Sequence, residues 1–375
     1  METIDGIMEL VTKNDLEGLA TSCGVNRYNT KLTGELIFKG LMRLILLGKK
    51  TSLRMLEALI NEGVDHFEPT STVSYSGISK RLKDIKWSYF EAIYQTLVNK
   101  LSSDLGSTNG RTLHRFDSTI INLSGRLIKD GLKIGGKASD SQIKVSVGLR
   151  QQLPTSIRFC TLQEESSEDL ALVRAINETR IDREDILLFD RGISKSGTFG
   201  EFEAKEYKFI TRLNVGRRYH VIKTHSTIVS STIIEDLTVN LYAKGSKTPL
   251  PTCLRLIKKL NKEGNEIWFL TNLFDMSALE ITELYRRRWD IEMFFKFIKQ
   301  NLGYKHFLSH SMNGMRVYIY MVLITALVFL AYKLKTKLQG FKIPIFRFNL
   351  ALEKSFVKSM ILLSGGNFDA VKHFF

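Results

Sequence analysis

Four polar residues recur at helical spacing in the segment Ser277–Leu302, and their types suit chemistry on a phosphate group. They are Tyr285, Arg288, Glu292 and Lys299. At 3.6 residues per turn they fall within one arc of roughly 60°, and apolar residues occupy the opposite side. Arginine and lysine neutralise phosphate, and a glutamate carboxylate offers a hard oxygen to a metal ion. The alternative is a solvated charged face, with Glu292 in ordinary pairs along the helix.

The ends of this segment are also visible in the sequence. Ser277 is followed three residues later by Glu280, the pattern of a capping box. Neither proline nor glycine interrupts the segment before Gly303. We therefore expect one long helix from Ser277 to about Leu302.

Two aspartates upstream stand beside predicted strands. Asp117 lies within the strand candidate Thr112–Leu123, and Asp190 directly follows the short apolar segment Ile186–Phe189. In α/β sheets, binding sites form at the ends of adjacent strands. We expect both carboxylates there, although Asp190 could instead cap the next helix and Asp117 could face solvent from its strand.

Three motifs together resemble one family. They are F-D-S-T at 116–119, F-D-R-G at 189–192, and Tyr285-x2-Arg288-x3-Glu292-x6-Lys299 with Trp289 after the arginine. In this order they are similar to the two aspartate motifs and the Y-R-E-K signature of bacterial insertion-sequence transposases, in the insertion-sequence-four family of the DDE superfamily. The resemblance covers roughly residues 110–305.

The resemblance implies a site and its partners. Asp117, Asp190 and Glu292 would be catalytic and would hold two divalent ions, expected to be Mg²⁺ with Mn²⁺ able to substitute. Tyr285, Arg288 and Lys299 would position DNA phosphates near the cut. The partners implied are double-stranded DNA, at transposon ends and target, and a second copy of the chain in an active homodimer.

The order of predicted elements favours an α/β fold. Strands at 112–123, 143–150 and 156–162 are followed by a helix at 166–179, the strand 186–189 and a strand at 207–213. This order agrees with the ribonuclease-H-like mixed sheet that the resemblance implies. Residues 214–272 are rich in strands and are interpreted as a β-rich insertion.

We accordingly predict five regions. Residues 1–108 form an N-terminal helical DNA-binding domain, and 109–213 form the first part of the catalytic core. Residues 214–272 form an inserted β-subdomain, 273–335 the second part of the core, and 336–375 a basic and apolar C-terminal segment.

The charge of the chain predicts a polyanionic partner. The formal net charge is +15, and residues 286–360 alone hold 14 Lys plus Arg against 3 Asp plus Glu, a net of +11. In the N-terminal region, the hydroxyl-rich segment 70–86 carries Lys80 and Arg81, and could lie on DNA in a helix-turn-helix arrangement. An ordinary basic surface helix is the alternative.

Other classes of protein are disfavoured. The 3 cysteines are far apart and no HExxH motif occurs, which argues against a zinc protein or a disulfide scaffold. The uncharged segment 317–332 is shorter than the roughly 20 residues that cross a bilayer, so we expect a buried helix and no membrane. The acidic N-terminus does not resemble a signal peptide. Together with the resemblance to bacterial transposases, these features lead us to expect a cytoplasmic location associated with the bacterial nucleoid.

The function expected is metal-dependent cleavage at transposon ends followed by strand transfer into target DNA. One alternative is a ribonuclease-H-like nuclease without strand transfer. Another is a transposase-derived protein that binds DNA without cutting it, which an intact set of three carboxylates disfavours because such a protein has no chemical need for them.

Overall fold

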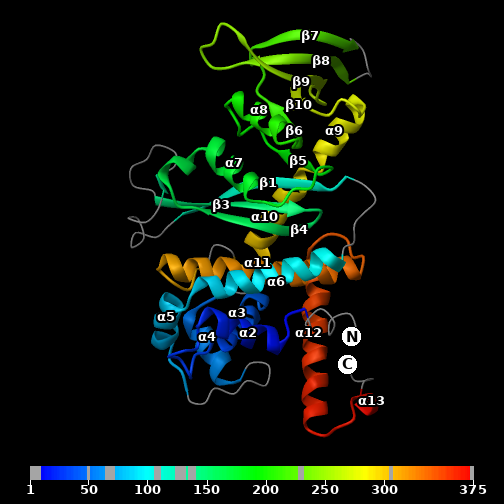
Figure 1. Ribbon diagram of the computed structural model, residues 1–375. Coiled ribbons are helices and arrows are strands. Elements are labelled where there is room, and N and C mark those ends of the chain that lie inside the picture. Colours follow the sequence, from blue (N-terminus) through cyan, green and yellow to red (C-terminus); the bar gives the residue numbers. More distant parts are fainter. Residues whose placement is uncertain are drawn as a thin grey trace. The chain divides into compact units, whose positions relative to one another are not determined.

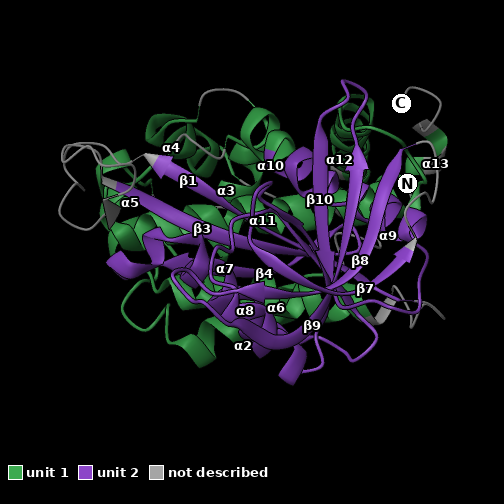
Figure 2. Cartoon of the chain, turned by 90° about the horizontal axis from the view of Figure 1, so that it is seen from above, with its two compact units in different colours: residues 1–106, 296–375 green, residues 107–295 purple. Residues whose placement is uncertain are grey.

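A computed structural model gives the fold of the chain (Figure 1). It describes residues 10–48, 51–63, 72–104, 111–122, 132–133, 141–226, 232–303 and 307–371. The chain divides into two compact units, which Figure 2 distinguishes by colour. Unit 1 comprises residues 1–106 and 296–375, and unit 2 comprises residues 107–295.

Unit 1 is helical. Its N-terminal part contains α2 (Lys13–Cys23), α3 (Gly34–Leu46), α4 (Leu53–Asn61), α5 (Tyr75–Asp84) and α6 (Trp87–Asp104). Hydroxyl side chains begin several of these helices, as Thr12 does for α2 and Ser74 for α5, because each oxygen accepts a hydrogen bond from a free amide of the first turn. The predicted helices 35–47, 52–61 and 87–101 are confirmed to within a few residues.

The C-terminal part of unit 1 contains α11 (Met312–Lys335), α12 (Lys342–Leu363) and α13 (Phe368–Val371). Helix α11 packs along α6 and also touches α3, α5 and α12. Trp87 on α6 stacks on Tyr320 of α11 with ring centroids 6.1 Å apart. Among the described helices, α11 alone is long and apolar enough to cross a membrane, but 89% of its most apolar window is buried in the protein. The expected buried helix is therefore confirmed, and it is the core helix of unit 1.

Unit 2 is built on one mixed sheet (Figure 1). In chain order its strands are β1 (Leu113–Asn122), β2 (Leu132–Lys133), β3 (Ser141–Arg150), β4 (Leu153–Cys160), β5 (Ile186–Phe189), β6 (Lys208–Leu213), β7 (Tyr219–Ser226), β8 (Ile233–Tyr242), β9 (Pro249–Leu260) and β10 (Glu266–Thr271). The spatial order is β2-β3-β1-β5-β6-β10-β9-β8-β7, with β4 also paired to β3. Strands β1, β5 and β6 run parallel at the centre.

Helices cover both faces of this sheet, as expected from buried strands that alternate with helices. The short 3₁₀ helix η2 (Gln163–Ser166) leads into α7 (Glu168–Asn177), and α8 (Gly197–Ala204) follows β5. Leu187 and Phe189 of β5 pack with Phe202 of α8 on one face. Ile186 and Leu188, which alternate with them, pack on the opposite face. There they meet α9 (Ala278–Arg286), which begins at the predicted capping box of Ser277 and Glu280.

The β-rich insertion differs from our expectation in one respect. Strands β7 to β10 extend the central sheet, because β10 pairs with β6, so the insertion is not a separate β-subdomain. Residues 233–242 form a single strand, β8. A tight turn joins β9 to β10: Gly264 adopts φ of 81°, and the Asn261 amide donates to the Asn265 carbonyl.

Gly148 on β3 offers a test of the packing around β1. A methyl group at this position would meet the Ser156 hydroxyl and would lie 2.8 Å from the Phe116 ring. Gly148→Ala should therefore lower the free energy of unfolding by about 1–3 kcal/mol through overpacking. Urea unfolding would measure this against Gly197→Ala, where a methyl group meets nothing within 4 Å. Equal midpoints for the two variants would contradict the packing described here.

Candidate active site

The sheet brings the two predicted aspartates to the same edge. Strands β1 and β5 are parallel neighbours in which Arg115 pairs with Leu188. Asp117 and Asp190 each lie two residues beyond these partners. Since side chains alternate along a strand, both carboxylates share the face on which α9 packs. Asp190 directly follows β5, as predicted, whereas Asp117 lies within β1 and not at its end.

Asp117 is held in a largely buried position. Its carboxylate accepts a hydrogen bond of 2.8 Å from the Ser118 amide. The pKa of Asp117 is raised to about 6, chiefly by burial. The Ser118 amide and Arg288 oppose this rise, and the nearby charges of Glu168 and Asp190 contribute to it. The site therefore disfavours an isolated negative charge on Asp117, and a cation bound there would relieve this penalty.

The expected single helix from Ser277 to Leu302 is wrong, because the structure divides it into α9 and α10 (Trp289–Asn301). The division falls at Arg287 and Arg288, whose amides donate to the carbonyls three residues earlier, at Leu284 and Tyr285. Glycine and proline are absent here, so the sequence gives no signal of the break. The break is caused by a contact from strand β1.

Arg115 on β1 provides that cause. Its Nε donates a 2.6 Å hydrogen bond to the Arg287 carbonyl, which therefore has a partner outside the helix. Its guanidinium also forms a 3.1 Å ion pair with Asp290 and bonds the Gln151 carbonyl. The side chain is 1% exposed, and burial lowers the pKa of Arg115 to about 10. Arg115 thus ties the strand that carries Asp117 to the junction of α9 and α10.

Arg288, next to this junction, interacts with all three predicted carboxylates. Its guanidinium bonds Glu292 at 2.5 Å, and its charge acts on Asp117 and Asp190. Tyr285, buried between α9 and the sheet, donates its hydroxyl to Asp190 at 3.2 Å. Burial raises the pKa of Tyr285 far above its ordinary range, so the phenol stays protonated and remains a donor. Tyr285, Arg288 and Glu292 therefore belong to one site with the two aspartates.

A fourth carboxylate, Glu168, also belongs to this region and was missed by the sequence analysis. It accepts from the Ser118 hydroxyl at 3.3 Å and forms a 2.7 Å ion pair with Lys144. Glu168 approaches the F-D-R-G motif because Gly192 has no side chain: a methyl group there would lie 3.0 Å from the Glu168 Cβ. No spacing in the sequence relates Glu168 to Asp117, since only the packing of α7 on β1 joins them.

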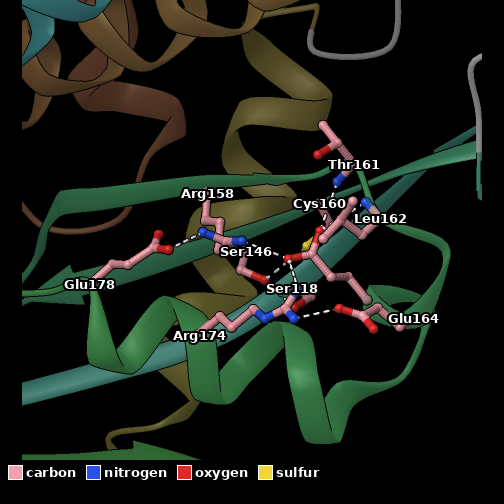
Figure 3. A network of polar contacts seen from close by, with 10 residues as sticks. Ser118, Ser146, Arg158, Cys160, Thr161, Leu162, Glu164, Arg174 and Glu178 are labelled. Atoms are coloured by element: carbon pink, nitrogen blue, oxygen red, sulfur yellow. Dashed lines mark hydrogen bonds and ion pairs between the residues drawn. The ribbon is translucent and has the colours of Figure 1, made fainter.

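A polar network fixes the start of α7 beside β1 (Figure 3). At its centre the buried Glu165 accepts from Arg158 at 2.6 Å and from Arg174 at 2.8 Å. Although burial by itself would raise the pKa of Glu165, hydrogen bonds from Arg158, the Leu162 amide and Arg174 hold it at about 2. The carboxylate is therefore ionised, and this network holds the segment that leads to Glu168.

The three carboxylates have the right chemistry to bind a hard divalent cation, but they do not lie close enough together in this structure to surround one. Asp117, Asp190 and Glu292 supply carboxylate oxygens, the ligands that Mg²⁺ prefers. Within the described parts of the chain, however, no group of three or more acidic, histidine or cysteine side chains lies close enough to hold an ion. The fit therefore rests on donor chemistry and on the burial of Asp117.

The remaining predicted DNA contacts lie in unit 1. Lys299 is half-buried near the end of α10, beyond Lys296, where that helix enters unit 1. Lys80 on α5 is exposed. Arg81 requires a correction: its side chain is 6% exposed and donates to the backbone carbonyls of Leu32 and Val25, so it is committed to the interior. Of the predicted pair, only Lys80 is available to DNA.

Sequence comparison gives the family. A family model described as the transposase DDE domain matches residues 115–328, which is more than half of the chain and includes all three carboxylates. The chain belongs to this family. The expectation of a DDE transposase relationship, drawn from the three motifs, is confirmed.

Two curated relatives agree with this membership. The chain is 31% identical over 166 residues to “Putative transposase y4zB” of Sinorhizobium fredii, covering 43% of this chain and 45% of that protein. It is 22% identical over 233 residues to “Probable transposase for insertion sequence element IS5377” of Geobacillus stearothermophilus, covering 61% of this chain and 59% of that protein. The matches thus span about half the length of these relatives.

A solved structure supports the fold. The synaptic complex of piggyBac transposase with hairpin DNA, determined by cryo-electron microscopy, matches 95% of this chain and 81% of that chain. The TM-score is 0.52 at 11% sequence identity. The predicted ribonuclease-H-like α/β fold is therefore confirmed.

The position of Arg115 predicts that its substitution disturbs the site, which the DNA cleavage proposed below would report. Arg115→Lys keeps the charge but cannot bond Arg287, Gln151 and Asp290 at once. We expect single-turnover cleavage to fall about 100-fold, because small displacements of reacting groups carry penalties of this size. Amide hydrogen exchange at residues 287–291 should rise in parallel, which reports the junction directly.

Arg255→Lys is the matched control, because Arg255 is also a buried arginine, bonded to Asp236 and to two backbone carbonyls, but on β9. The Arg255 variant should keep cleavage near the parental rate per folded molecule. A double-mutant cycle of Arg115→Lys with Arg288→Lys should be non-additive if Arg115 acts through Arg288. Additive losses would count against this role.

Proposed function

We propose that this protein is a transposase that cuts DNA at transposon ends and joins them to target DNA. The observation that carries the proposal is the assembly of Asp117, Asp190 and Glu292 around Arg288 at one edge of the sheet. Membership in the transposase DDE domain family supports the same chemistry. At the finer level, the spacing of Tyr285, Arg288, Glu292 and Lys299 favours the insertion-sequence-four branch with its Y-R-E-K signature.

We assign the three carboxylates as ligands of two divalent ions, Mg²⁺ or Mn²⁺. When bound, such ions activate an attacking oxygen and stabilise the leaving oxygen of a phosphodiester. Arg288 balances the charge of the carboxylates and can turn to a phosphate of the substrate. Tyr285 orients Asp190 through its hydroxyl. Arg115 keeps Arg288 and Glu292 in place through the Arg287 carbonyl.

A basic cavity beside these residues supports DNA as the substrate. It measures about 690 Å³ and lies between β6, β9 and β10 of the sheet and the junction of α9 and α10. Five of its lining side chains are cationic and two are acidic: Arg212, Lys259, Arg286, Arg287 and Arg288 against Glu283 and Asp290. Cations arranged in this way attract and position a phosphate backbone.

A nuclease without strand transfer is the second candidate, because the same carboxylates would serve hydrolysis alone. Joining of a 3′-hydroxyl end to a second DNA molecule separates the two. A DNA-binding protein that does not cut is disfavoured, because it has no chemical need for three carboxylates gathered beside Arg288. An active homodimer and a bacterial cytoplasmic, nucleoid-associated location complete the proposal.

Removing any one of the three carboxylates should abolish cleavage while DNA binding is retained. Asp117→Ala, Asp190→Ala and Glu292→Ala each remove a ligand for the metal but no phosphate contact, and chelation of divalent ions should have the same effect. Nicking of a labelled duplex in Mg²⁺ measures cleavage, and gel retardation measures binding.

Glu184→Ala is the control for these variants, since Glu184 is an exposed acid just before β5 that pairs with Lys208. It should cut like the parent. An alanine variant of Asp117, Asp190 or Glu292 that nicks DNA near the parental rate would remove that residue from the assignment.

We further propose that the second strand is cut through a DNA hairpin, in which the first 3′-hydroxyl attacks the opposite strand. The piggyBac structure contains hairpin DNA. The basic cavity beside Arg288 could hold the bent backbone that such an attack requires, and drawing a base from the stack would cost a few kcal/mol. One metal-binding site could then perform successive in-line displacements.

End cleavage should then yield a product of twice the strand length on a denaturing gel. Arg288→Ala should reduce this product more than the first nick, because the bent intermediate needs the additional charge. Arg286→Ala is the matched control: Arg286 lines the same cavity but is exposed and pairs with Glu283. Fully cut DNA without the long product would mean that the second strand is cut by another route.

A further inference from the structure

The interior position of Arg81 gives a role to a loop that the sequence analysis did not consider. Arg81 on α5 donates from Nε to the Leu32 carbonyl at 2.9 Å and from Nη2 to the Val25 carbonyl at 2.7 Å. These two carbonyls stand at the two ends of the loop 25–32, between α2 and α3. One buried guanidinium thus holds both ends of the loop against α5.

Asn26 closes the same loop from within. Its side-chain amide donates to the Glu35 carboxylate at 3.0 Å, and its carbonyl accepts from the Gly34 amide at 2.8 Å. The loop is therefore held by side-chain hydrogen bonds at its base, and its middle faces solvent. Tyr28 in this middle part is 85% exposed, with the Arg27 guanidinium 5.5 Å from its ring centroid.

A basic hollow lies between the loop and α5. It measures about 420 Å³, and its lining includes Tyr28 and Lys31 from the loop and Gly77, Lys80 and Asp84 from α5. Lys31 and Lys80 are exposed on its two sides, and neither is ion-paired within the described residues. Asp84 is its one acidic lining residue in this part of the structure. The hollow therefore offers two cations and an exposed phenol to one ligand.

No close packing contact requires glycine at position 77 on α5, beside the hollow. A methyl group at this position would meet nothing closer than the Ser74 hydroxyl, at 3.4 Å. Glycine inside a helix such as α5 is nevertheless unfavourable by about 1 kcal/mol relative to alanine. The fold would therefore tolerate a side chain at position 77, but that side chain would occupy the hollow. Glycine here leaves room for a ligand that approaches the helix closely.

We propose that Arg27, Tyr28, Lys31 and Lys80, here called the loop surface, dock the sugar-phosphate backbone of double-stranded DNA. The proposal rests on the proposed function, which supplies DNA as the partner. Lysine, arginine and tyrosine side chains are the donors that typically bond phosphate oxygens, and such contacts set the register of a protein on DNA without reading sequence. Arg81 is then a positioning residue that holds the loop in place.

Salt dependence of binding tests the loop surface in the full-length protein. Each lost phosphate contact should reduce the slope of log affinity against log salt by about 0.9. With a short fluorescein-labelled duplex of mixed sequence, Lys31→Gln/Lys80→Gln should therefore lower the slope by about 1.8 units. Fluorescence anisotropy across a salt series measures this slope.

The charge-matched control is Lys13→Gln/Lys205→Gln, which also removes two exposed lysines but from α2 and from the end of α8. The control should leave the slope near the parental value. Equal reductions in both double variants would show that only net charge matters and would overturn the loop surface.

Gly77→Leu separates binding from folding. Leucine has a higher helix propensity than glycine, so the variant should be at least as stable as the parent. Its side chain should block the hollow and weaken binding to the same duplex about tenfold. Unchanged affinity in a folded Gly77→Leu protein would overturn the proposal.

Cleavage in Mg²⁺ by the same proteins distinguishes this inference from the proposed function. At saturating DNA the parent should nick the duplex, whereas Asp117→Ala should keep the parental salt slope and lose nicking, because it removes a carboxylate and no cation. A parent protein that binds through the loop surface but never cuts would refute the proposed function alone. A parent that cuts, together with a double variant whose salt slope is unchanged, would refute the loop surface alone.

Discussion

The hydrogen bond from Arg115 to the Arg287 carbonyl is the constraint on which the site depends. A buried guanidinium is stable only when its donors find partners, and here three backbone carbonyls and Asp290 supply them. The carbonyl that Arg115 engages lies at the point where α9 ends. A straight helix would continue the arc of Tyr285, Arg288 and Glu292 without interruption. The junction instead exposes Trp289 and buries Arg288 beside the carboxylates.

The electrostatics of the site follow from this placement. Burial raises the pKa of Asp117, and the neighbouring charges of Glu168 and Asp190 act in the same direction. Arg288 is the cation within hydrogen-bond reach of Glu292, and its charge also acts on the two aspartates. Lys144 pairs with Glu168, so Arg288 is shared among Asp117, Asp190 and Glu292. Divalent ions would supply the further positive charge that three carboxylates need.

One unit of the chain is inserted into the other. Residues 107–295 form the sheet and its helices as one continuous insertion, and the segments before and after it fold together in unit 1. The apolar helix α11 completes the core of the N-terminal helices, so these helices are not an independent domain. Within this unit the buried Arg81 supports the loop 25–32 through hydrogen bonds to its backbone. Its neighbour Lys80 is exposed to solvent.

The sequence by itself determined the strands β1, β3, β5 and β6 and the capped start of α9, and it singled out Asp117, Asp190 and Glu292 as candidate site residues. These features depend on local patterns: alternation of apolar residues, a capping box, and motifs at fixed spacing. It could not give the break between α9 and α10, the interior role of Arg81, the proximity of Glu168, or the joining of β10 to β6. Each of these depends on a hydrogen bond or a pairing between residues tens to more than a hundred positions apart. Only the folded chain brings such residues together, and a buried arginine and an exposed one look alike in sequence until the partners of the buried one are known.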